Sequence, residues 1–202
     1  MKLKLFFVTK FFVFLLLVCF KSYAEDLKSK KNIITIGSNN AIVKIKIFSS
    51  FTCPHCATFH NKVVPEIKKK YVDSGKVQLI FIDFPLDQAA FNASKILHCL
   101  GEKKRINFMD LIYENQSEWT GGSNIEDINK NLKKIVKNLG ISSISFDKCL
   151  IDQDISDKIL NGRIEASRKY TINSTPTVII NEEKLDGSAN FKNIKKKIDK
   201  II

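Results

Sequence analysis

Two cysteines stand two residues apart in the segment SSFTCPHCATFH, which covers residues 49–60. A Cys-x-x-Cys pair can form a structural disulfide, provide half of a zinc site or act as a redox dithiol. β-Branched and aromatic residues precede the segment, and a helical pattern follows it. The chemistry of Cys53 and Cys56 therefore depends on what a strand-to-helix junction does to two thiols.

The junction favours a reactive thiol. If a strand ends near Ser49 and a helix starts at Cys53, Pro54 occupies the first helical position, where its fixed φ is favourable. The sulfur of Cys53 then faces unpaired N–H groups and the positive end of the helix dipole, which stabilise a thiolate. His55 can donate to this sulfur or add positive charge. Cys56 lies one turn further in, so we expect it to be the more buried, resolving thiol with a higher pKa.

A static disulfide and a zinc site are the alternatives for this pair. A disulfide between residues 53 and 56 closes a ring of only four residues, so it constrains the unfolded chain little. Zinc could take Cys53, Cys56 and His60, but the chain has no second Cys-x-x-Cys, and His98 beside Cys99 completes the set poorly. We therefore predict a redox pair and no metal, with His60 and His98 as ordinary helix residues.

The first residues indicate export. MKLKLFFVTKFFVFLLLVCFKSYA begins with lysines, continues with an apolar run over 11–20 and ends with small residues at Ser22 and Ala24. The apolar run is about half of the roughly 20 residues that span a bilayer. We therefore expect residues 1–24 to be a cleaved signal peptide and the protein to act in the periplasm. An uncleaved membrane anchor is the alternative.

Cysteine content agrees with export. After removal of the leader, Cys53, Cys56, Cys99 and Cys149 remain. An even number of cysteines in an exported protein suggests disulfides. Of the three pairings, the spacing favours 53–56 together with 99–149.

The charge of the chain says little about partners. The formal net charge is +12, with 33 basic and 21 acidic residues. The lysines are scattered through helical segments, and no aromatic stripe alternates with them. We therefore expect solvated helix faces and no nucleic-acid partner.

Hydrophobic periodicity predicts a small α/β unit interrupted by helices. Strand patterns occur around 33–36, 41–48 and 76–85 and within 175–187, and a helical stripe with Pro65 as a kink covers 53–72. Residues 87–170 contain helical patterns only, including a capping box that opens at Ser123 and a stop at Gly140. We divide the chain after the leader into 25–86, a helical insertion over 87–170, and 171–202.

This order of elements carries a resemblance. A strand, C-P-H-C at a helix start, a helical insertion, and then Thr175-Pro176-Thr177 entering a strand resemble the DsbA family of thiol–disulfide oxidoreductases over essentially the whole mature chain. The resemblance implies a thioredoxin fold, with a central mixed β-sheet flanked by helices and an inserted all-helical domain. Cys99 and Cys149 resemble the branch of the family that has a second, structural disulfide.

The resemblance also implies roles for individual residues. Cys53 would be the exposed sulfur that exchanges with substrate, Pro54 and His55 would tune its pKa, and Cys56 would resolve the mixed disulfide. Pro176 would be a cis proline that faces the active site. Thr175 beside it would offer backbone hydrogen bonds to a bound peptide.

The implied activity is that of a periplasmic oxidase. It would pass the Cys53–Cys56 disulfide to unfolded or newly exported cysteine-containing proteins and be reoxidised by an inner-membrane partner. No cofactor beyond the dithiol is implied, and we expect a monomer. The alternatives are an isomerase or reductase of the same fold, or a non-catalytic chaperone or binding module.

One position departs from the family pattern. The family often has a buried acid six residues before the first cysteine, and the residue there is Ile47. A proton relay through that acid would be absent. The neighbouring Lys46 should point to the other face of the strand.

Overall fold

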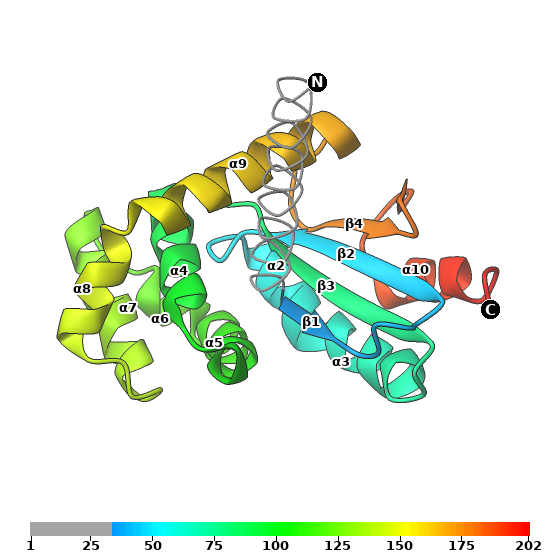
Figure 1. Cartoon of the computed structure of the whole chain (residues 1–202), viewed down its shortest axis with the longest axis horizontal. Coiled ribbons are helices and arrows are strands. Elements are labelled where there is room, and N and C mark those ends of the chain that lie inside the picture. The colour runs from blue at the N-terminus through cyan, green and yellow to red at the C-terminus, as the bar shows by residue number, and fades with distance from the viewer. Residues whose placement is uncertain (1–33) are drawn as a thin grey trace, which may run out of the picture. The chain divides into compact units, whose positions relative to one another are not determined.

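The computed structural model describes residues 34–202 (Figure 1). The predicted signal peptide, residues 1–24, lies outside the described residues. No helix within residues 34–202 is long and apolar enough to cross a membrane.

Within these residues a mixed five-stranded sheet has the order β1-β3-β2-β4-β5. Its strands are β1 (Ile34–Ile36), β2 (Val43–Ser49), β3 (Val77–Asp83), β4 (Thr177–Ile180) and β5 (Glu183–Lys184). β3 runs parallel to β2, and the other neighbouring strands are antiparallel. β3 lies between β1 and β2, as expected for a strand too apolar to face water on either side.

β2 leads to the Cys-x-x-Cys motif, and its side chains alternate between the two faces of the sheet. Val43, Ile45 and Ile47 are buried in the main core, whereas Lys44 is exposed on the other face. The alternation ends at the half-buried Ser49, where the chain leaves the sheet.

An irregular helix follows β2 and covers one face of the sheet. It consists of α2 (Pro54–Thr58), the π-helical η1 (Phe59–Val63), α3 (Val64–Ile67) and the π-helical η2 (Lys68–Val72). The irregularity centres near Pro65, at the start of α3, because proline cannot donate to the preceding turn. Phe59, Ile67 and Tyr71 of the predicted stripe are buried, and Val63 is half-buried.

The chain between β3 and β4 is helical, which agrees with the thioredoxin fold carrying a helical insertion. Its elements are α4 (Gln88–Cys99), α5 (Glu102–Glu114), α6 (Gln116–Trp119), α7 (Ile125–Lys137), α8 (Ser143–Leu150) and α9 (Gln153–Tyr170). In Figure 1, α9 returns from this group of helices towards the sheet. A last helix, α10 (Phe191–Ile198), closes the described chain.

The start of α7 differs by one residue from the sequence expectation. Asn124, not Ser123, is the N-cap, and its side-chain oxygen accepts a hydrogen bond from the N–H of Asp127 at 2.9 Å. Asparagine caps a helix as well as serine does, so the capping-box pattern alone did not distinguish the two neighbours.

Two apolar clusters hold these layers together. The larger one joins the sheet to the α2–η2 helix, to α10 and to the helical segment, where Trp119 and Leu132 are fully buried. The smaller one lies on the other face of the sheet and contains Phe48, Phe84, Ala166, Ile172 and Ile179.

Candidate active site

Cys53 is the N-cap of α2, and Pro54 stands at the start of that helix, as the local sequence predicts. The N–H of Cys53 donates to the carbonyl of Ser50 at 3.2 Å. The carbonyl of Cys53 accepts the first helical bonds, from the N–H groups of Cys56 at 3.0 Å and Ala57 at 3.1 Å. The positive end of the α2 dipole therefore lies at Cys53.

The thioredoxin-type pair is present here as two free thiols, and both are buried. Cys53 is 8% exposed and Cys56 only 1%, whereas Pro54 and His55 between them are exposed. We expected a more open Cys53. Its Sγ donates a hydrogen bond to the carbonyl oxygen of Thr175 at 3.3 Å, and the loop that contains Thr175 covers the sulfur.

The loop at Thr175 reaches Cys53 because β4 pairs antiparallel with β2, with Thr177 opposite Phe48. The start of β4 therefore lies beside the end of β2. The peptide bond between Thr175 and Pro176 is cis. The hydroxyl of Thr175 is buried and has no hydrogen-bond partner among residues 34–202.

Cys56 lies in an environment that disfavours its thiolate. Burial raises the pKa of the Cys56 thiol to about 12, and the neighbouring sulfur of Cys53 adds to the increase. The Thr175 hydroxyl, unpaired in the dithiol, and the Ser50 backbone act in the opposite direction, because both could hydrogen-bond to a Cys56 thiolate. Burial also raises the pKa of Tyr113 well above its ordinary value, and charge on Cys56 contributes to that increase. The reduced Cys56 is therefore a neutral thiol at neutral pH.

Ile47 is 1% exposed and lies between Phe81 of β3 and Val178 of β4. The face of the sheet below the motif is therefore apolar at the position where the family often has an acid. Lys46 points to the opposite face, where its Nζ donates to the hydroxyl of Tyr170 at 2.8 Å.

Both histidines that we expected to be ordinary helix residues make specific polar contacts. Nε2 of His98 lies 2.6 Å from Oδ2 of Asp83, whose other oxygen accepts a hydrogen bond from Ser94 at 2.8 Å. Nε2 of His60 lies 2.7 Å from Oδ1 of Asp110. His60, the third ligand of the zinc alternative, is thus paired with a carboxylate.

Sequence reasoning also missed Gln116, because nothing in its local pattern points to the motif. Its side-chain amide donates to the carbonyls of Phe51 at 2.7 Å and Cys53 at 3.1 Å. Gln116 belongs to α6, so the helical segment contacts the backbone that carries the reactive sulfur.

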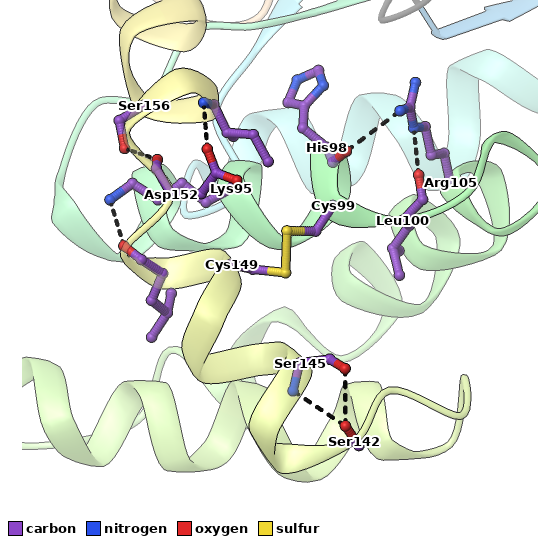
Figure 2. The surroundings of a disulfide bond; sticks show 12 residues. Lys95, His98, Cys99, Leu100, Arg105, Ser142, Ser145, Cys149, Asp152 and Ser156 are labelled. Carbon is purple, nitrogen blue, oxygen red and sulfur yellow. Dashed lines mark hydrogen bonds between the residues drawn. A yellow bond between two sulfur atoms is a disulfide. The ribbon is translucent and has the colours of Figure 1, made fainter.

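Cys99 and Cys149 form the second disulfide, as predicted, with an S–S distance of 2.11 Å. Figure 2 shows that it joins the end of α4 to α8. Beside it, Nζ of Lys95 donates to the carbonyl of Leu150 at 2.9 Å, a second connection between the same two helices. The pair is therefore placed to fasten helices within the insertion.

Known proteins resemble this chain over most of its length. A family model described as Thioredoxin matches residues 29–200. A Bacillus cereus protein called "Probable disulfide bond formation protein D" is 31% identical over 82% of this chain and 77% of its own length. "Disulfide bond formation protein D" of Bacillus subtilis is 25% identical over 82% of this chain and 75% of its own.

Solved structures agree with these relatives. The crystal structure of Wolbachia pipientis alpha-DsbA1 has a TM-score of 0.76 and 31% sequence identity, and the match covers 84% of this chain and 90% of that one. Its fold and the fold described above are the same. The chain therefore belongs to the DsbA-like thiol–disulfide oxidoreductases of the thioredoxin superfamily.

Proposed function

We propose that this protein is a periplasmic oxidase that donates the Cys53–Cys56 disulfide to exported proteins that contain cysteines. The observation that carries the proposal is the placement of the two sulfurs. Cys53 caps the N-terminus of α2 under the Thr175 loop, and Cys56 lies buried behind it. Cys53 is the less buried of the two, 8% exposed against 1% for Cys56, so we assign the exchange with substrate to it.

The first step is attack on the disulfide form by a substrate thiolate. The thiolate bonds to Sγ of Cys53, the Cys53–Cys56 bond breaks, and its electron pair goes to the sulfur of Cys56. Because the pKa of the Cys56 thiol is raised to about 12, this sulfur takes up a proton. The product is a mixed disulfide between Cys53 and the substrate.

The second step completes the transfer. A second substrate thiolate attacks the substrate sulfur of the mixed disulfide, and Cys53 leaves as a thiolate at the N-terminus of α2. The substrate has lost two electrons and gained a disulfide, and the protein holds a dithiol. An inner-membrane partner would reoxidise it. Because the two sulfurs carry the electrons, the mechanism requires no organic cofactor or metal.

The Thr175–Pro176 loop is suited to binding the substrate chain. In the dithiol, the Thr175 carbonyl accepts the Cys53 S–H. Once Cys53 is part of a mixed disulfide it has no hydrogen to donate. The carbonyl is then free to accept a hydrogen bond from a substrate backbone N–H, which would align an extended peptide beside the sulfur.

An isomerase or reductase would use the same residues, so the direction of transfer must be measured. The equilibrium of the Cys53–Cys56 couple with glutathione buffers, with Cys99–Cys149 left paired, distinguishes these functions. A potential near roughly −120 mV supports an oxidase, and a value near roughly −270 mV would make the protein a reductase.

A trapping experiment distinguishes exchange from simple binding. Cys56→Ser, with Cys53 first converted to its mixed disulfide with glutathione, should release glutathione as a thiol and accumulate a mixed disulfide with a reduced, unfolded protein that contains one cysteine, because the resolving thiol is missing. Cys53→Ser should form none. Equal non-covalent retention of the substrate by both variants, with no mixed disulfide, would instead indicate a binding module.

A further inference from the structure

The four-residue turn that carries Cys53 is held by the helical segment from two directions. Its side chains contact the start of α4: the hydroxyl of Thr52 donates to Oδ2 of Asp87 at 2.6 Å, and Oγ of Ser50 accepts from the N–H of Leu86 at 3.2 Å. The carbonyls of Phe51 and Cys53 in the same turn accept hydrogen bonds from Gln116 of α6. The turn is thus defined by tertiary contacts.

The contact through Gln116 uses both hydrogens of one amide group. Nε2 donates to the carbonyl of Phe51 at 2.7 Å and to the carbonyl of Cys53 at 3.1 Å. A side-chain amide has two N–H donors, so this geometry leaves neither unpaired. The Cys53 carbonyl is also the acceptor for the first bonds of α2. The Cys53 carbonyl oxygen therefore belongs both to the turn and to the first hydrogen bonds of α2, and Gln116 binds it.

Gln116 is itself held in place. The indole N–H of Trp119, three residues along and fully buried, donates to the carbonyl of Ile112 at 3.0 Å. The hydroxyl of Thr120 donates to the carbonyl of Gln116 at 2.7 Å. These contacts anchor the short helix α6 on α5, so the Gln116 side chain starts from a fixed backbone.

Cys53 needs such support because its own side chain makes no capping hydrogen bond to α2. The position of its sulfur relative to the helix N-terminus depends on the Cys53 backbone, which has φ −77° and ψ 118°. A rotation about ψ would move the carbonyl away from Gln116. The same rotation would swing Sγ relative to the positive end of α2, which favours a thiolate.

We propose that Gln116 is a positioning residue for thiol–disulfide exchange, which fixes the Cys53 peptide so that Sγ stays at the N-terminus of α2. This role rests on the function proposed above. Gln116 touches neither sulfur and acts through the backbone of Cys53. Its loss reduces stabilisation of the Cys53 thiolate, and so it favours the disulfide over the dithiol.

The test compares the equilibrium of the Cys53–Cys56 couple with glutathione in full-length variants. Gln116→Met keeps the length of the side chain and removes both donors. We expect its equilibrium to shift about tenfold towards the disulfide, which corresponds to about 30 mV. Gln116→Glu places carboxylate oxygens against two carbonyls. Its shift from wild type should be larger at pH 7 than at pH 4, where a protonated carboxyl can donate again.

Asn61→Ala is the matched control. The Asn61 amide also donates to a backbone carbonyl across the same boundary, to Tyr113 at 3.3 Å, but not to the turn. It should lose stability while its equilibrium stays within twofold of wild type. An unshifted Gln116→Met, or an equal shift in Asn61→Ala, would overturn the role of Gln116.

A second variant is needed if Gln116→Met does not fold. It keeps the side-chain amide but shortens the side chain. Gln116→Asn is one methylene shorter, so its equilibrium with glutathione should also shift towards the disulfide. An unshifted equilibrium in this variant would count against the proposal. Wild-type protein that fails to exchange with glutathione would overturn the proposed function itself. Normal wild-type exchange with unshifted variants would overturn the role of Gln116 alone.

Discussion

Sγ of Cys53 and the carbonyl oxygen of Thr175 lie 3.3 Å apart, although 122 positions separate them in the chain. The contact joins the end of β2 to the start of β4, the two segments that meet at the motif. Both cysteines are buried, but Cys53 keeps 8% of its surface exposed and Cys56 only 1%.

This difference predicts selective alkylation of the reduced protein. At pH 7, iodoacetamide should modify Cys53 first, and in a Cys53→Ser variant Cys56 should react at least 100-fold more slowly than Cys53 does in wild type. With a pKa of about 12, only about one Cys56 in 10⁵ is a thiolate at pH 7. Peptide mapping by mass spectrometry follows both sites. Comparable rates at the two cysteines in folded protein would contradict the assignment of roles.

The second disulfide should contribute strongly to stability. Cys99 and Cys149 are 50 residues apart, and closing a loop of that size is worth about 4 kcal/mol in the chain-entropy model. Replacing both with alanine should lower the free energy of unfolding in urea by about that amount. The double replacement of Cys53 and Cys56, which are free thiols here and would close a ring of only four residues when oxidised, is the control and should cost much less. A loss below about 1 kcal/mol in the first variant would disprove the stabilising role.

The two cysteine pairs should also differ in how easily they are reduced. Cys99 is the last residue of α4 and Cys149 the next-to-last of α8, so both sulfurs lie at negative helix ends. Thiolates are disfavoured there, whereas Cys53 lies at a positive end. In glutathione buffers that reduce Cys53–Cys56, we expect Cys99–Cys149 to remain oxidised, as measured by thiol labelling. Simultaneous reduction of both pairs would contradict this.

Glu182, in the turn between β4 and β5, should make stability depend on acid pH. Hydrogen bonds from Lys46, Tyr170 and Lys169 lower its pKa from 4.5 to about 2. A lowered carboxyl pKa stabilises the fold above the unfolded value of 4.5, and this contribution disappears as the pH falls through about 2. The Glu182 side chain is 56% exposed, so solvent screening limits its contribution to about 1 kcal/mol.

Glu182→Gln should therefore be less stable than wild type in urea at pH 6 and equal to it near pH 2. Glu165→Gln, at an exposed position of α9, is the control and should match wild type at both pH values. A deficit that persists unchanged at pH 2 would show that the effect is not electrostatic.

The two His–Asp pairs offer a comparison between a buried and an exposed carboxylate, since His60 and His98 both have mostly enclosed side chains. The side chain of Asp83 is 12% exposed and that of Asp110 is 52% exposed. Asp83→Ala leaves the hydroxyl of Ser94 and the ring of His98 without their acceptor in the interior, so we expect a loss of about 2–3 kcal/mol. Asp110→Ala should cost less than about 1 kcal/mol. If the two variants lost the same free energy of unfolding in thermal or urea denaturation, burial of the carboxylate would not explain the difference expected here.

Local patterns predict the parts of the site that adjoin each other in sequence. Pro54 after a strand indicates a helix start at Cys53, and β-branched residues around Thr177 indicate a strand. The branch resemblance and the spacing also predicted the Cys99–Cys149 pairing.

Contacts between distant segments could not be predicted in this way. Gln116 reaches a carbonyl 65 positions earlier in the chain, and His60 pairs with an acid 50 positions later. These partners meet only because α5 and α6 pack beside the start of the catalytic helix. A single sequence contains no periodicity that reports such packing, so His60 had the appearance of an ordinary helix residue.

The strand order has a consequence for how access to the sulfur can change. β3 and β4 pair with β2 on opposite sides. The last residues of β3 and the first residues of β4 both lie beside the C-terminal end of β2. The helical segment therefore leaves the sheet on one side of the motif and returns on the other. The motif therefore lies between the two connections of the helical segment. Because these connections flank the motif, a change in the helical segment would act on the surroundings of Cys53 from both sides, while β2 is held in the sheet between β3 and β4.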